Sequence, residues 1–271
     1  MLGRALISLQ LYRNLYIPVL IQSHTEGHGI NMVFKKIWKV LVCTLFCIAF
    51  SLAEANEALI EYAKPVDAVE TAMKKELEAS GAANSVVRFI NDAFNLPTPL
   101  LFFFGGGDGP LYDSHDNRVI IPYAFLAEVK NRFVEVRYKQ TGVSEDDTTQ
   151  DALMHTLFHE FAHAMIFMCD LPVVGKEEDA ADALATILLI EFFEEGQEIV
   201  LSAADLFDLE SGDSEVLEEE DFWDEHSLDA QRYYSALCHV YGSDPQKYAD
   251  ILKDGVFSED RAHLCEEEYE N

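Results

Sequence analysis

Two histidines and a glutamate in the segment His159-Glu160-Phe161-Ala162-His163 point most directly to a chemistry. Residues four apart in a helix lie about 40° from each other around the axis, so both imidazoles can bind one metal ion. Glu160 lies about 100° from His159, beside that ion, where its carboxylate can accept a proton from water. The pattern predicts zinc-assisted hydrolysis, with His159 and His163 as ligands and Glu160 as the general base.

A third protein ligand is expected, because a catalytic zinc normally binds three side chains and leaves one position for water. Metzincins carry a glycine and a further histidine after the motif, but Ile166 and Cys169 occupy those positions here. Deformylase-like sites need a cysteine upstream of the motif, and none lies between residue 55 and the motif. Both classes are therefore excluded.

The acidic segment 177–182, at the start of the next predicted helix, offers the missing ligand. We expect Glu178 to bind the metal, with Glu177 and Asp179 as alternatives. Asp182 lies one turn further on and is expected to hydrogen-bond the free nitrogen of a ligating histidine. A plain acidic first turn, stabilised by the helix dipole, is the competing interpretation.

Helices dominate the elements that must position these residues. The motif lies in a predicted helix, 151–169, which is apolar on most sides and is expected to be central and buried. Acidic residues make up 11 of the 21 positions in 205–225, which predicts a solvated loop, because the order of a calcium-binding loop is absent. The fold class is α+β, mostly helical, with a small sheet beside the motif helix. Strands are predicted at 57–63, 100–104 and 118–122, and helices at 66–78, 82–95, 123–138, 177–194, 227–241 and 244–252.

The first 55 residues differ from the rest, with five basic residues against two acidic ones. Three lysines between positions 35 and 39 precede an apolar run, 40–52, and Ala53-Glu54-Ala55 follows it. This order predicts a secretory signal peptide over 32–55, with 1–31 as an N-terminal extension and 56–271 as a single domain. An uncleaved anchor is the alternative, although thirteen helical residues rise only about 20 Å. The expected location is periplasmic or secreted, in a bacterial envelope.

The amino-acid composition limits the kinds of molecule that the protein can be expected to bind. The net charge of −30 argues against nucleic acid, and membrane contact is expected only transiently, through the signal peptide. The hydrophobic content of 49 % is enough to bury a core. Export implies an oxidising compartment, where Cys238 and Cys265 are the favoured disulfide pair. Cys169 lies in an apolar helical run and is expected to be a buried free thiol.

The motif followed by Glu177-Glu178-Asp179-Ala180-Ala181-Asp182 resembles the gluzincin arrangement of thermolysin-like peptidases. More closely, the chain resembles a zinc metallopeptidase-like family of exported bacterial proteins that is known as a domain of unknown function. The resemblance spans most of 57–270 and implies a zincin-like fold, a Zn²⁺ cofactor and a peptide or protein substrate. Its matching segments are 109–113, 121–123, 226–232, 238–245 and 261–267.

The resemblance also implies roles for residues outside the motif. His226 corresponds to a downstream histidine that stabilises the oxyanion, a role for which Arg232, Tyr233 and Tyr234 compete. Capping of the following helix is the structural alternative for His226. The strand 118–122 corresponds to an edge strand that pairs with an extended substrate, or else is a plain structural strand.

Together these features predict an exported zinc metallopeptidase that hydrolyses peptide bonds by zinc-activated water with Glu160 as the base. A non-catalytic envelope binding protein with a structural metal is one alternative. A zinc amidase that acts on a cell-wall linkage is another, because it uses the same chemistry.

Overall fold

Four short strands form one sheet in the computed structural model, which describes residues 56–213, 216–253 and 255–270. The order across the sheet is β1 (Ala58–Tyr62), β2 (Leu100–Phe104), β4 (Arg118–Ile121) and β3 (Leu111–Asp113). The first three strands run parallel, whereas β3 runs antiparallel to β4. The predicted signal peptide and N-terminal extension lie outside the described residues, and the domain boundaries stay predictions.

The position of β4 corrects the prediction for the strand 118–122. Leu101 of β2 pairs with Arg118 on one side of β4, and Asp113 of β3 pairs with Arg118 on the other. Because both sides of β4 are occupied, it is a plain structural strand, the second of the two interpretations that the sequence left open. The edge strand next to β4 is β3, which has only three residues and is too short to produce an alternating pattern.

The remaining elements are helices, so the prediction of a mostly helical α+β fold is confirmed. The short 3₁₀ turns η1 and η2 cover Tyr138–Thr141 and Glu220–Phe222. The α-helices are α2 (Ala68–Ser80), α3 (Ala82–Ala93), α4 (Tyr123–Glu135), α5 (Glu145–Cys169), α6 (Glu177–Phe192), α7 (Gly196–Ser211), α8 (Asp229–Ser243), α9 (Ala249–Lys253) and α10 (Glu259–Glu270).

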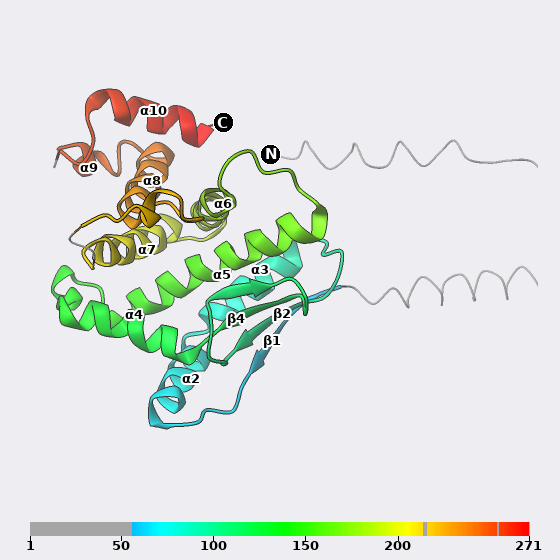
Figure 1. Cartoon of the computed structure of the whole chain (residues 1–271). Helices are drawn as coiled ribbons and strands as arrows, with labels where there is room; N and C mark the ends of the chain where they lie inside the picture. Colours follow the sequence, from blue (N-terminus) through cyan, green and yellow to red (C-terminus); the bar gives the residue numbers. More distant parts are fainter. Residues whose placement is uncertain (1–55, 214–215, 254, 271) are drawn as a thin grey trace, which may run out of the picture. The chain divides into compact units, whose positions relative to one another are not determined.

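Helix α5 lies between the sheet and a group of helices formed by α6, α7 and α8 (Figure 1). Its apolar residues face both neighbours, and Leu157, Phe158 and Phe161 are fully buried. The helix begins six residues earlier than predicted, because the Ser144 side chain accepts a hydrogen bond from the backbone N–H of Asp147. The prediction of a central, buried motif helix is confirmed.

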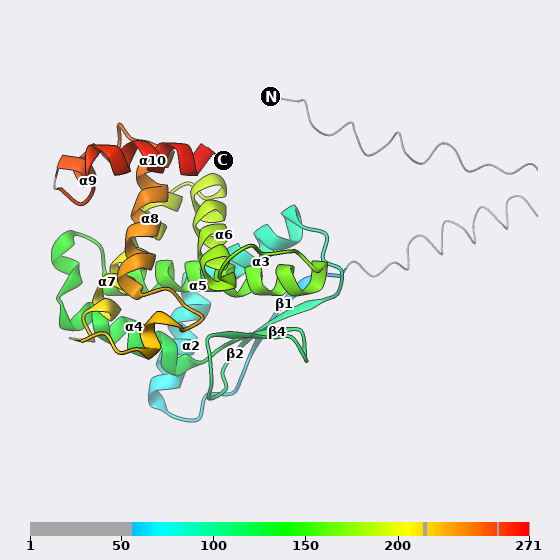
Figure 2. The same cartoon turned by 45° about the horizontal axis from the view of Figure 1, so that its top comes forward.

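Two further helices correct the sequence prediction for acidic segments. Residues 205–211 belong to α7 rather than to a loop, because Leu206 and Phe207 are buried among acidic neighbours. A Cβ on Gly196, at the start of α7, would lie 1.9 Å from the carbonyl oxygen of Leu189, so only glycine allows this close approach to α6. The second unpredicted helix, α10, packs across the end of α8 (Figure 2).

A disulfide between Cys238 of α8 and Cys265 of α10 joins these two helices, as the sequence favoured. Cys169 is free but exposed, so the prediction that it is buried is wrong. It is the last residue of α5, five residues beyond Ala164, the last buried residue of that helix. Within the described ranges, no helix has the length and apolar character needed to cross a membrane.

Candidate metal centre

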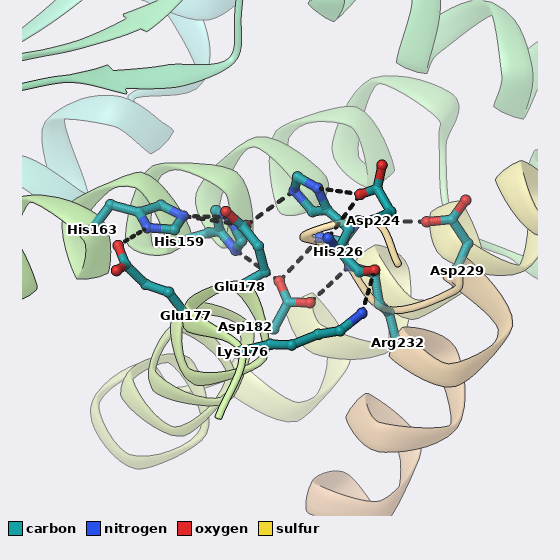
Figure 3. Close-up of polar contacts among 10 residues, drawn as sticks. All are labelled: His159, His163, Lys176, Glu177, Glu178, Asp182, Asp224, His226, Asp229 and Arg232. Carbon is teal, nitrogen blue, oxygen red and sulfur yellow. Dashed lines mark hydrogen bonds and ion pairs between the residues drawn. The ribbon is translucent and has the colours of Figure 1, made fainter. Parts of the chain in front are cut away.

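Three imidazoles surround one carboxylate where α5, α6 and the segment before α8 meet (Figure 3). The Glu178 Oε2 atom lies 3.0 Å from His159 Nε2, 3.3 Å from His163 Nε2 and 3.0 Å from His226 Nε2. Residues 159 and 163 come from successive turns of α5, and Glu178 comes from the first turn of α6. Residues far apart in the sequence thus present their polar atoms to one point.

The His159, His163 and Glu178 atoms have the spacing of a zinc site. Their mutual distances are 3.0, 3.1 and 3.3 Å. Three atoms bonded to one tetrahedral zinc lie about 3.3 Å apart, because each bond is about 2.0–2.2 Å long. Two imidazole nitrogens and one carboxylate oxygen are also a donor set that catalytic zinc uses. The residues present therefore fit a zinc ion.

Each imidazole has a carboxylate on its other side, which directs its Nε2 atom toward Glu178 (Figure 3). His159 Nδ1 lies 2.7 Å from Asp182 Oδ1, and His163 Nδ1 lies 2.9 Å from Glu177 Oε1. Residue 226 is placed through its backbone, because its N–H donates to an Asp224 oxygen at 2.8 Å. Outer carboxylates of this kind fix the tautomer of a ligating histidine and make it a better ligand.

Arg232 of α8 anchors the Asp182 carboxylate. Its Nε and Nη2 atoms donate to the two Asp182 oxygens at 2.7 and 3.0 Å. The guanidinium carbon also lies 4.0 Å from the centre of the Phe207 ring, in a cation–π contact. This chain of contacts connects α8 and α7 to the candidate ligand His159, although neither helix provides a candidate ligand.

The charges of the site are strongly coupled. Burial opposes ionisation of Glu178, but hydrogen bonds from His159, His163 and His226 hold its pKa far below the usual range. Burial disfavours the imidazolium of His159, but hydrogen bonds to Asp182 and Glu178 raise its pKa to about 9. The metal-free protein therefore holds protons where a metal ion would bind, and metal binding must release them.

Glu160 is 6 % exposed and lies beside these ligands, at the end of a cleft of about 380 Å³. Burial raises the pKa of its carboxyl, while the nearby His159 and His163 oppose that shift. The backbone N–H of Tyr112 donates a hydrogen bond to the carboxylate. Strand β3 therefore lines the cleft and orients Glu160, which makes Glu160 suited to accepting a proton from water.

The structure separates the alternatives that the sequence left open. Glu177 contacts the outer nitrogen of His163, and Asp179 is exposed and makes no hydrogen bond or ion pair with a described residue. Arg232 is held by Asp182 rather than directed into the cleft. Among the described residues that line the cleft, neither Tyr233 nor Tyr234 occurs. His226 does line it, next to Glu178.

Some residues of the site had no role predicted from the sequence. The Asp224 carboxylate and the edge strand Leu111–Asp113 were not assigned roles, although the strand lies inside a segment that carries the family resemblance. His155, one turn before His159 on α5, is buried, and its Nε2 atom lies 3.2 Å from the Thr186 hydroxyl. Burial lowers its pKa to about 4, so the imidazole stays neutral. Its contact with Thr186 joins α5 to α6.

Replacement of Asp182 by Asn is expected to weaken both the metal site and the fold. The change removes the carboxylate that binds the buried Arg232 guanidinium most closely and leaves only Asp229, 3.5 Å from its Nη1 atom, which costs about 3 kcal/mol of unfolding free energy. Loss of the outer carboxylate of His159 is expected to lower zinc affinity about 10- to 100-fold. Urea unfolding of the metal-free protein and competition titration with a zinc indicator measure the two effects.

The exposed Asp179, three residues earlier in α6, provides the matched control. Asp179→Asn should leave both the unfolding free energy and the zinc affinity close to those of the original protein. Equal zinc affinity in Asp182→Asn and Asp179→Asn would contradict the role assigned to Asp182.

Comparison with known proteins gives one match. The model of the family described as "Putative metallopeptidase" matches residues 62–271. The match includes the helices α5 and α6, the strand β3 and the segment that carries His226. No curated protein and no solved structure matches the chain.

Proposed function

Because the chain belongs to the "Putative metallopeptidase" family, we propose that it is a zinc-dependent peptidase that hydrolyses peptide bonds with Glu160 as the general base. The convergence of His159 Nε2, His163 Nε2 and Glu178 Oε2 within 3.3 Å carries the proposal. Hydrolysis needs a buried carboxyl beside such a centre, whereas a purely structural metal site does not need one.

The proposed zinc ligands are His159, His163 and Glu178. When bound, zinc supplies Lewis acidity, which lowers the pKa of water and polarises a peptide carbonyl. The chain's own contribution is the fixed orientation of the ligands through Asp182, Glu177 and the residues that hold them.

Proton transfer is assigned to Glu160. Its buried carboxylate accepts a proton from the attacking water and passes it to the nitrogen that leaves. Burial supports this role, because it raises the pKa of Glu160 and so makes its carboxylate a stronger proton acceptor. The hydrogen bond from the Tyr112 backbone holds the carboxylate in place for both steps.

His226 is proposed to stabilise the oxyanion of the tetrahedral intermediate. Its Nε2 atom faces the cleft 3.0 Å from Glu178, and the hydrogen bond to Glu178 raises its pKa above the ordinary value for histidine. A protonated imidazole is a strong donor for a developing negative charge. Lys176 supports its placement by donating to the His226 carbonyl oxygen at 2.7 Å.

The free side of β3 is the proposed docking edge for an extended peptide. Among the described strands, β3 pairs only with β4, and Leu111 and Tyr112 line the cleft together with Glu160. A substrate strand added there would run past the catalytic carboxylate. Export to the periplasm or the medium is also part of the proposal, and the Cys238–Cys265 disulfide supports it.

A chelator experiment on the purified protein tests this function. We expect zinc in the protein by elemental analysis, cleavage of an unbiased peptide library, loss of cleavage with 1,10-phenanthroline and recovery after addition of zinc. Bound zinc without cleavage of any peptide would contradict the proposal and favour the non-catalytic binding protein. Cleavage of isolated cell-wall amide linkages but of no peptide would favour the amidase.

A further inference from the structure

A second cavity adjoins the proposed catalytic groups, and His159, Glu160 and His226 line both it and the cleft along β3. This inner cavity has a volume of about 200 Å³. It is also lined by Leu206, Phe207 and Glu210 of α7 and by Arg232 of α8. Because the cavity shares its wall with the proposed catalytic groups, whatever occupies it lies next to the reacting bond.

Among the described residues, no basic side chain forms an ion pair with the Glu210 carboxylate, which lines this cavity. Among the described residues its side chain makes no hydrogen bond or ion pair, and the arginines that influence it, Arg132 and Arg232, are held by other carboxylates. Burial and the neighbouring Asp229 carboxylate raise the pKa of Glu210 to about 7. A cation bound at this position would therefore stabilise the ionised form.

The surroundings of Glu210 favour a cation. Glu210 lies in the last turn of α7, where the backbone carbonyl groups carry partial negative charge and no basic residue compensates it. On its other side is a cavity of about 270 Å³, which Glu210 and His226 also line, together with Asp221, Asp224 and Asp229. No Lys or Arg occurs among the described residues that line this acidic cavity.

The shape of the inner cavity suits one long side chain. Its volume is below the roughly 300–1,000 Å³ of pockets for drug-sized ligands. Phe125 and Leu206 provide apolar walls for a methylene stem, and Glu210 provides a charged partner for its end. Lys and Arg have this combination of an apolar stem and a cationic head.

We propose that the inner cavity binds a Lys or Arg side chain of the substrate next to the cleaved bond, and that Glu210 determines this specificity. The inference rests on the proposed peptidase function, since it names the class of peptide that this site takes. Arg232 does not oppose it, because Asp182 accepts hydrogen bonds from its Nε and Nη2 atoms and Asp229 lies 3.5 Å from its Nη1 atom, so two carboxylates offset its charge.

Binding of matched peptides tests the specificity without cleavage. Octapeptide pairs that differ only in Lys or Met at one position are titrated calorimetrically into the zinc-loaded Glu160→Gln variant, for each position in turn. At one position we expect the Lys peptide to bind about tenfold more tightly, as a charged hydrogen bond typically contributes. Adding Glu210→Gln should reduce this ratio to about one. A ratio near one before that change, or an unaltered ratio after it, would overturn the proposal.

Asp208→Asn is the matched control, since it removes the same charge from the same helix at an exposed residue that lines neither cavity. Asp208→Asn should keep the ratio of the affinities for the Lys and Met peptides. A fall in this ratio as large as that in Glu210→Gln would refute a specific role for Glu210. Circular dichroism and thermal unfolding check that the variants fold.

The same peptides separate this inference from the proposed function. Equal cleavage of Lys and Met peptides at every position, unchanged by Glu210→Gln, would refute the specificity and leave the peptidase intact. Glu210-dependent binding of Lys peptides without cleavage by the original protein would refute the peptidase and leave a binding site for basic side chains.

Discussion

Replacement of Glu160 by Gln is expected to lower kcat/KM for peptide hydrolysis about 10²- to 10⁴-fold, which is the usual contribution of a positioned general base. The amide is isosteric with the carboxylate and can keep the hydrogen bond network of the cleft, but it cannot accept the proton from water. Zinc should stay bound, because the three ligand atoms belong to other residues. Peptide cleavage assays and elemental analysis on the same preparation measure both quantities.

A control for this variant lies on the same helix. Glu145→Gln, at the opposite end of α5, removes the same charge far along the helix from the metal centre and should leave kcat/KM nearly unchanged. Activity of Glu160→Gln close to that of Glu145→Gln would remove Glu160 from the mechanism. Loss of zinc from Glu160→Gln would instead show that the carboxyl holds the metal site together.

Replacement of His163 by Ala is expected to abolish both zinc binding and hydrolysis. The change removes one of three ligand atoms, so the loss of zinc affinity should exceed the roughly 10- to 100-fold expected for an outer residue such as Asp182. The His163 side chain is 14 % exposed, against 8 % for His159, so we expect the metal-free fold to survive its loss. Zinc competition titration, circular dichroism and peptide cleavage check these expectations.

His263→Ala serves as the control for the loss of an imidazole, because His263 is exposed on α10 and its nearest carboxylate is Glu267 on the same helix. It should keep the zinc content and the activity. Stoichiometric zinc at undiminished affinity in His163→Ala would show that the proposed ligand set is wrong.

Much of the fold could be predicted because its signals are local. The motif helix, the strand 100–104 and the helix after the loop at 170–175 are each rich in apolar residues within one segment, and all three occur in the structure. The helix α7 was missed, since its buried Leu206 and Phe207 lie within a stretch where acidic residues dominate the composition. The strand β3 was missed because three residues are too few to show alternation, and its partner strand alone determines that it is extended.

The candidate site also has one part that the sequence alone determines and another that depends on the tertiary structure. The sequence alone determined that His159 and His163 lie on one face of a helix with Glu160 beside them, because the helical repeat fixes the directions of residues in one segment. Only the tertiary structure decided that Glu178, rather than Glu177 or Asp179, reaches both imidazoles, since that depends on how α6 packs against α5. The positions of His226 beside Glu178, of the Tyr112 backbone beside Glu160 and of Glu210 in the wall of the inner cavity likewise depend on the tertiary structure. The helical repeat acts over a few residues, whereas these contacts join segments that only packing of the core brings together.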